Sequence, residues 1–195
     1  MRTASVARLT GETRIELTLV IDGTGQLDGR TAIGFFDHML NALVKHAGFD
    51  VKLSCEGDLH IDDHHTVEDV GICLGQAFAG AMADKSGIQR FGSCYAPLDE
   101  ALARAVVDIS GRSYLAFEAN FTRSGIGSFS TEMVQEFFRA FTDHARITLH
   151  LTLLSGINAH HQVEAIFKAA ARALRQAVAV DPGQAGVIPS TKGVL

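Results

Sequence analysis

The chain has 195 residues, of which 47% are hydrophobic and 20% charged, with a formal net charge of -5, as in a globular protein able to bury a large core. No apolar run approaches the roughly 20 residues of a membrane span, and the N-terminus lacks the apolar segment of a signal peptide, so we expect a cytoplasmic protein without membrane contact. The scattered Lys and Arg residues argue against nucleic-acid binding and favour a small-molecule partner.

The first part of the chain has clear apolar periodicity. The segment before residue 22 alternates as a half-buried strand does, and the sequence DGTGQLDG after it predicts a turn. Asp62 and Asp63 precede a long apolar helical pattern and are candidates for its N-cap. Strands are predicted over 14–22 and 50–57, and helices over 35–47 and 66–84.

The second part repeats this order of elements. Strands are predicted over 101–110, 113–120 and 146–154, and helices over 131–144 and 160–180. Each half is therefore expected to contain two strands, a helix, a strand and a helix, with one further strand that the pattern does not place. The segment 88–97 is expected to connect the halves, and the resulting fold class is α+β, with helices packed between two sheets.

An internal repeat carries most of the histidines. Residues 36–68 and 134–164 share an amphipathic stretch, then HA, then an alternating stretch, a glycine and HHxVE. The corresponding pairs are His46 with His144, His64 with His160, His65 with His161, and Glu68 with Glu164.

The spacing within each repeat predicts metal ligands. Residues four apart share one face of a helix, so His64 with Glu68, and His160 with Glu164, each present an imidazole and a carboxylate to one ion. His65 and His161 point about 100° away. Such nitrogen and carboxylate donors suit Mn, Zn, Fe or Ni, and the duplication favours two ions. The alternative is that the histidines only cap helices at the surface.

Cations and hydroxyls outside the repeat predict a phosphate site. Arg90 lies in IQRFG, Arg112 in SGRSY, and Ser190, Thr191 and Lys192 in the tail PSTKG. Together these groups can surround a phosphate. A phosphorylated substrate is therefore expected beside the metal ions. The three cysteines Cys55, Cys73 and Cys94 lack the spacing of a zinc or redox motif and are expected to be reduced.

Several longer motifs resemble one enzyme family. They are FFDHML, GDLHIDDHHTVEDVGI, GIQRFG, PLDEAL, DISGR and NAHHQVEAIFKAAARALRQA, and the likeness runs from residue 8 to residue 193. The chain resembles imidazoleglycerol-phosphate dehydratase, a lyase of histidine biosynthesis. This resemblance implies one domain over 1–195 with two pseudo-symmetric halves, about 1–92 and 93–195, of the ribosomal protein S5 domain 2-like fold. It also implies a 24-subunit shell built from trimers, active sites between subunits, and two Mn²⁺ per site.

The reaction that the resemblance implies is a dehydration. D-erythro-1-(imidazol-4-yl)glycerol 3-phosphate loses water to give 3-(imidazol-4-yl)-2-oxopropyl phosphate, through an imidazolate that bridges two metal ions. The implied metal ligands are His38, His64, His65, Glu68, Glu136, His160, His161 and Glu164. The implied catalytic carboxylates are Glu12, Glu68 and Glu164, and the implied substrate and phosphate contacts are Glu12, Arg90, Asp99, Arg112, Lys168, Ser190 and Lys192.

The duplication suggests how the ligands divide. One ion is expected at His64, Glu68 and His161, and the other at His38, His65, His160 and Glu164. Glu136 is the repeat partner of His38 and stands where many family members carry a histidine. The fourth ligand of the first ion is therefore left open between the Glu136 carboxylate and His144.

Three other functions are compatible with parts of the pattern. A dinuclear metallohydrolase of phosphate esters would release phosphate and form no ketone. A metal-storage or metal-sensing shell would need the histidines but not Glu12, Arg90 or Lys192. A histidine-rich structural module would fold normally after its metal is removed.

Overall fold

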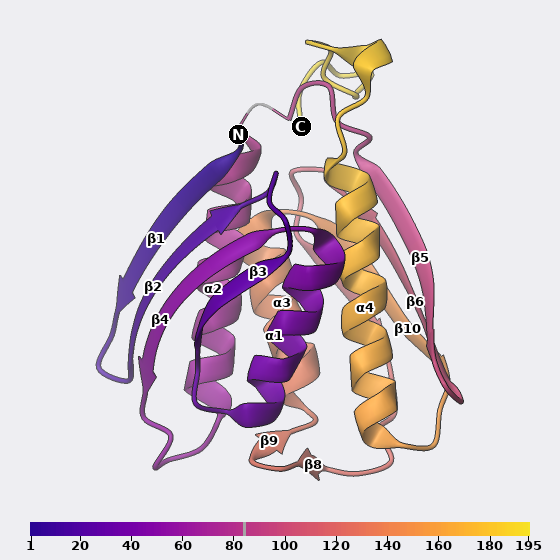
Figure 1. The fold of residues 1–195 in the computed structure, drawn as a ribbon. Helices are drawn as coiled ribbons and strands as arrows, with labels where there is room; N and C mark the ends of the chain where they lie inside the picture. The colour runs from indigo at the N-terminus through magenta and orange to yellow at the C-terminus, as the bar shows by residue number, and fades with distance from the viewer. Residues whose placement is uncertain (84) are drawn as a thin grey trace.

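The computed structural model describes residues 1–83 and 85–195. Within these residues four α-helices form a layer between two four-stranded sheets, so the predicted α+β arrangement is confirmed (Figure 1). The first sheet has the order β1 (Thr3–Leu9), β2 (Thr13–Val20), β4 (Asp50–Gly57), β3 (Gln26–Arg30). The second has the order β5 (Phe91–Leu98), β6 (Ala101–Asp108), β10 (Thr148–Ser155), β7 (Tyr114–Glu118), and β8 (Gly125–Ile126) pairs with β9 (Phe129–Ser130).

The two sheets have equivalent topology. In each sheet the first three strands of the order pair antiparallel, and the last strand pairs parallel with its neighbour. Each half of the described chain therefore runs strand, strand, strand, helix, strand, helix, apart from the small β8–β9 pair. The duplicated order of elements that the sequence predicted is present, and each half contains the further strand that the pattern did not place.

Besides the short β8–β9 pair, sequence periodicity missed three strands. They are β1, β3 and β5, and each lies at the edge of its sheet. The expected turn after residue 22 contains β3 from Gln26 onward, and the expected connection over 88–97 contains β5 from Phe91. The predicted turn was too long, because β3 is an edge strand that is exposed at most of its positions and therefore carries no alternating apolar pattern.

The helices begin and end close to the predicted positions. They are α1 (Gly34–Ala47), α2 (His64–Met82), α3 (Met133–Ala145) and α4 (Ala159–Val178), and a short 3-10 helix follows at Pro182–Gln184. The α2 helix begins two residues earlier than predicted, where Oδ1 of Asp62 accepts the N–H of His64 at 2.9 Å. Of the predicted range 66–84, Asp84 lies outside the described residues.

Close packing of helices sets the spacing of the site. A Cβ atom at Gly71 of α2 would lie 2.8 Å from the carbonyl oxygen of Phe137 in α3. A Cβ atom at Gly75 would lie 2.6 Å from the carbonyl oxygen of Phe141. Only glycine permits this approach, which brings the first turns of α2 and α3 together. The helix layer encloses a phenylalanine-rich core that includes Phe36, Phe137, Phe138 and Phe167. Among the described helices, none combines the length and the apolar character that crossing a membrane requires.

Candidate active site

A first cluster of possible metal ligands joins α1 to α4. His38 of α1 and His160 and Glu164 of α4 each place one ligand atom within 4.8 Å of the others. The Nε2 atoms of both histidines lie 3.1 Å from Oε2 of Glu164. The side chain of Phe35 packs edge-on against the His160 ring, with ring centroids 5.0 Å apart. Since α1 and α4 lie side by side (Figure 1), this cluster combines residues from both halves of the chain.

Glu164 is ionised in this cluster despite its burial. Its side chain is 12% exposed, and burial alone would raise its pKa. Hydrogen bonds from Lys168 and His38 outweigh that effect and lower the pKa of Glu164 to about 2. The Lys168 Nζ atom lies 2.6 Å from Oε1 of Glu164. A deprotonated carboxylate beside two imidazoles suits Mn²⁺ or another divalent ion of intermediate hardness.

A second cluster joins α2 to α3. His64, Glu68 and Glu136 also place one ligand atom each within 4.8 Å of one another. Nε2 of His64 lies 3.8 Å from Oε2 of Glu68. Glu136, which the repeat paired with His38, thus stands beside the predicted ligands, and the alternative His144 instead contacts the carbonyl oxygen of Ala140 at 2.9 Å.

An arginine faces the second cluster. The guanidinium of Arg139 donates a hydrogen bond to Oε2 of Glu136 and lies 3.6 Å from Oε1 of Glu68. It therefore offsets the negative charge of the two carboxylates. The sequence analysis did not single out this residue, although its position three residues after Glu136 places it one helical turn away.

The second histidine of each HH pair points away from both clusters. Nδ1 of His65 lies 3.0 Å from Oδ2 of Asp58, and its Nε2 lies 3.6 Å from Oε1 of Glu12. Nδ1 of His161 lies 2.9 Å from Oε2 of Glu100. The hydrogen bond to Asp58 raises the pKa of His65, and that to Glu100 raises the pKa of His161.

These orientations leave the predicted division of ligands incomplete within one chain. The cluster predicted around His64 and Glu68 contains Glu136 but not His161, and the cluster predicted around His38, His160 and Glu164 does not contain His65. Asp58 and Glu100, which orient the outward histidines, were not predicted. Only their tertiary contacts identify them, since they precede their histidines by 7 and 61 positions.

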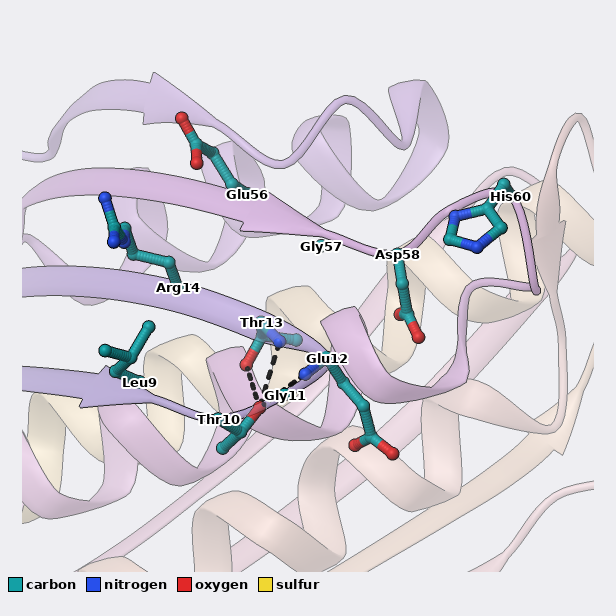
Figure 2. Close-up of a pocket in the computed structure, with 10 residues that line it drawn as sticks. All are labelled: Leu9, Thr10, Gly11, Glu12, Thr13, Arg14, Glu56, Gly57, Asp58 and His60. Atoms are coloured by element: carbon teal, nitrogen blue, oxygen red, sulfur yellow. Dashed lines mark hydrogen bonds between the residues drawn. The ribbon is translucent and has the colours of Figure 1, made fainter.

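Glu12 borders an open cavity of about 330 Å³ between two connecting segments. The cavity is lined by residues 9–14, around the β1–β2 connection, by Glu56 and Gly57 at the end of β4, and by Asp58 and His60 after it (Figure 2). The Glu12 side chain is 53% exposed and reaches toward His65. Its carboxylate is therefore accessible to a small molecule beside α2.

The predicted phosphate contacts gather at the other end of the helix layer. Arg90 pairs with Asp108, with 2.7 Å between Nε and Oδ1, and donates to the carbonyl oxygen of Pro189 at 2.8 Å. The backbone N–H of Arg90 donates to the carbonyl oxygen of Ala177, near the end of α4. These contacts place Arg90 beside the tail that carries Ser190 and Lys192.

Arg112 belongs to the same region, because a Cβ atom at its neighbour Gly111 would lie 2.7 Å from the backbone of Leu195. Ala177 and Glu164 are separated by about 20 Å along α4, at the usual rise per residue.

Asp99 forms the β5–β6 turn with a positive φ of 47°, and the adjacent Glu100 contacts His161. The predicted substrate residues thus lie in separate places on one chain.

Comparison with known proteins gives one family. The family model described as imidazoleglycerol-phosphate dehydratase matches residues 31–174. The imidazoleglycerol-phosphate dehydratase of Gluconobacter oxydans is 61% identical over 194 residues, which cover 100% of this chain and 98% of the relative. That of Dinoroseobacter shibae is 57% identical over 195 residues and covers 100% of both chains. The crystal structure of imidazoleglycerol-phosphate dehydratase from Staphylococcus aureus superposes with a TM-score of 0.83 at 40% identity, covering 91% of this chain and 99% of that chain.

Proposed function

The chain belongs to the imidazoleglycerol-phosphate dehydratase family of hydro-lyases in histidine biosynthesis, and on that premise we propose that it acts with two divalent metal ions, expected to be Mn²⁺. Its substrate would be D-erythro-1-(imidazol-4-yl)glycerol 3-phosphate and its product 3-(imidazol-4-yl)-2-oxopropyl phosphate. The observation that carries the metal dependence is the pair of separate His and carboxylate clusters, one on α1 and α4 and one on α2 and α3.

The donor sets fit the proposed ions. Each cluster combines imidazole nitrogen with carboxylate oxygen and no thiolate, a set that suits Mn²⁺ and comparable divalent ions. His38, His160 and Glu164 would hold one ion, and His64, Glu68 and Glu136 would contribute to the other. When bound, the ions supply Lewis acidity and fixed positive charge beside the imidazole ring of the substrate.

The remaining roles belong to side chains of the protein. Glu12 would act first as the general acid, giving its proton to the substrate hydroxyl, which departs as water, and then as the general base, taking a proton from carbon at the same carboxylate. The resulting enol becomes the ketone by moving one proton. Lys168 would keep Glu164 ionised and hold the substrate, with Asp99 as a further contact. Arg90, Arg112, Ser190 and Lys192 would bind the phosphate.

A complete site of this kind needs more than one subunit. Of the proposed phosphate contacts, Arg90 touches the end of α4, whereas the proposed ligands His160 and Glu164 lie in its first turns, about 20 Å away along the helix. His65 and His161 also direct ring nitrogens away from the clusters of their own chain. We therefore infer that the active site forms between copies of the chain in a large shell, with 24 subunits expected.

The decisive experiment uses purified, chelator-treated protein and the imidazole glycerol phosphate substrate. Ketone formation and phosphate release are followed in parallel, with and without added Mn²⁺. Ketone that depends on Mn²⁺ without phosphate release is the expected result. Phosphate release without ketone would instead identify a dinuclear phosphoesterase, and metal binding without turnover would indicate a metal-binding shell.

A further inference from the structure

A buried carboxylate beside the second cluster has no place in the proposed chemistry. Asp69 follows Glu68 on α2 but faces the first sheet instead of the cluster, and it is 5% exposed. Its Oδ2 atom accepts a 2.5 Å hydrogen bond from the hydroxyl of Thr13, and its Oδ1 atom lies 2.9 Å from Nε of Arg8. Asp69 therefore joins α2 to the strands on both sides of the Glu12 connection.

Asp69 stands at one end of a short hydrogen-bond chain. The hydroxyl of Thr13 donates to Oδ2 of Asp69, whose other oxygen faces the Arg8 guanidinium. The Thr10 hydroxyl, 3.3 Å from that of Thr13, is then the donor between the two. Its oxygen stays free to accept the N–H of Glu12 at 3.1 Å and that of Thr13 at 2.9 Å (Figure 2). The chain runs from Asp69 to the backbone of Glu12.

Packing contributes little to holding this connection. A Cβ atom at Gly11 would meet nothing within 4 Å, and the Glu12 side chain is half exposed. The connection is held by the hydrogen bonds at Thr10 and by one from the N–H of Asp58 to the carbonyl oxygen of Glu12, at 3.1 Å. The position of Glu12 therefore depends on polar contacts, of which the chain through Thr13 leads directly to the helix that carries His64 and Glu68.

We propose that Asp69, acting through Thr13 and Thr10, is a positioning residue that fixes Glu12 relative to the second metal cluster. This inference rests on the proposed function, in which Glu12 moves the proton. Asp69 touches neither substrate nor reacting atoms. It acts because proton transfer is sensitive to geometry, and a displacement of about 1 Å can reduce a rate by as much as roughly 100-fold.

The test compares three variants of the Mn²⁺-loaded protein. Thr13→Val removes the hydroxyl and is expected to lower kcat about tenfold or more, with KM and Mn²⁺ affinity within about twofold of wild type. Thr13→Ser keeps the hydroxyl and should restore kcat. The matched control is Thr18→Val on the same strand, which removes the 2.8 Å contact between Thr18 and Ser5 without touching the Glu12 connection.

A double mutant separates positioning from general destabilisation. In a Glu12→Gln background, Thr13→Val should cause no further decrease in kcat, because the group it positions is already absent. An equal loss of kcat in both backgrounds, or a wild-type kcat for Thr13→Val alone, would overturn the inference.

Two further results keep the test decisive. If Thr13→Val does not fold, the test uses Thr10→Val, which removes the next hydroxyl of the hydrogen-bond chain. This variant must show the same lowered kcat, and a wild-type kcat for it counts against the inference. If the wild type is active and the variants keep its kcat, only the positioning role is contradicted. A wild type that forms no ketone in the presence of Mn²⁺ removes the proposed function and the positioning role together.

Discussion

His38 of α1 and Glu164 of α4 meet across the helix layer, with 3.1 Å between Nε2 and Oε2, although they are 126 positions apart in the sequence. His160 contacts the same carboxylate oxygen at 3.1 Å. One carboxylate thus receives an imidazole from each half of the chain. The duplicated fold makes this meeting possible because it stacks the two helix pairs between the sheets.

Replacing His38 by Ala is expected to lower Mn²⁺ affinity at the first cluster by at least about tenfold, since even residues that only orient metal ligands contribute that much. The free Mn²⁺ signal in electron paramagnetic resonance, recorded during titration of chelator-treated protein, measures this. His150→Ala is the control, because His150 lies on β10 beside Tyr114 and outside both clusters. Equal Mn²⁺ binding by the two variants would contradict the assignment.

Arg139→Gln is expected to tighten Mn²⁺ binding by up to about fivefold, the scale of an exposed ion pair. In the structure the Arg139 guanidinium balances Glu136 and Glu68, and an incoming ion must compete with it. Glu136→Gln should have the opposite effect, because it removes a charged ligand. The same titration compares both variants, and weaker binding by Arg139→Gln would show that the arginine supports the ion.

Glu12→Gln is expected to lower kcat by about 10²- to 10⁴-fold, the usual contribution of a general acid or base. Mn²⁺ affinity should stay at the wild-type value because Glu12 is outside both clusters. Steady-state kinetics and Mn²⁺ titration on the same preparation check both points. A large loss of Mn²⁺ binding would mean that Glu12 serves the metal and not the proton.

Asp50→Ala is expected to destabilise the fold by about 1 kcal/mol at pH 7. Oδ1 of Asp50 accepts the N–H groups of Thr24 at 2.8 Å and Gln26 at 3.0 Å, and the hydrogen bond from Thr24 lowers the pKa of Asp50. A lowered folded-state pKa gives stability that is present above the unfolded-state value, roughly 3.9, and is lost as pH falls through the folded-state value.

Urea unfolding of the wild type and of Asp50→Ala should therefore differ at pH 7 and converge toward pH 3. A difference that grows as the pH is lowered would contradict this sign. The prediction concerns the turn before β3 and not the active site, so it is independent of metal content.

Cys55 and Cys73 are expected to resist alkylation in the folded protein. Burial raises the pKa of Cys55 to about 12 and that of Cys73 to about 11, and the thiolate is the reactive form. Iodoacetamide labelling at pH 8, read out by peptide mass spectrometry, should modify them only after denaturation. Native labelling of Cys73 at the rate found in denaturant would show that α2 opens readily.

The outer contacts of the site could not be predicted from the sequence. Asp58 and Glu100 reach their histidines through connections between elements, and Asp69 reaches Thr13 across 56 positions. Nothing in their spacing distinguishes them from solvated acidic residues. In contrast, Glu68 and Glu164 were predictable because each lies one helical turn from a histidine.

The sequence by itself determined the repeated order of elements, the helix-between-sheets class and the two HHxxE corners, because helical periodicity fixes which neighbours share a face. Only the tertiary structure decided that His38 joins Glu164, that Arg139 faces Glu136, and that Arg90, a predicted phosphate contact, lies at the far end of α4. These relationships depend on how the helices pack and on connections whose course local periodicity does not determine. Contacts within one turn follow from backbone geometry, whereas contacts between elements follow from the packing of the whole core.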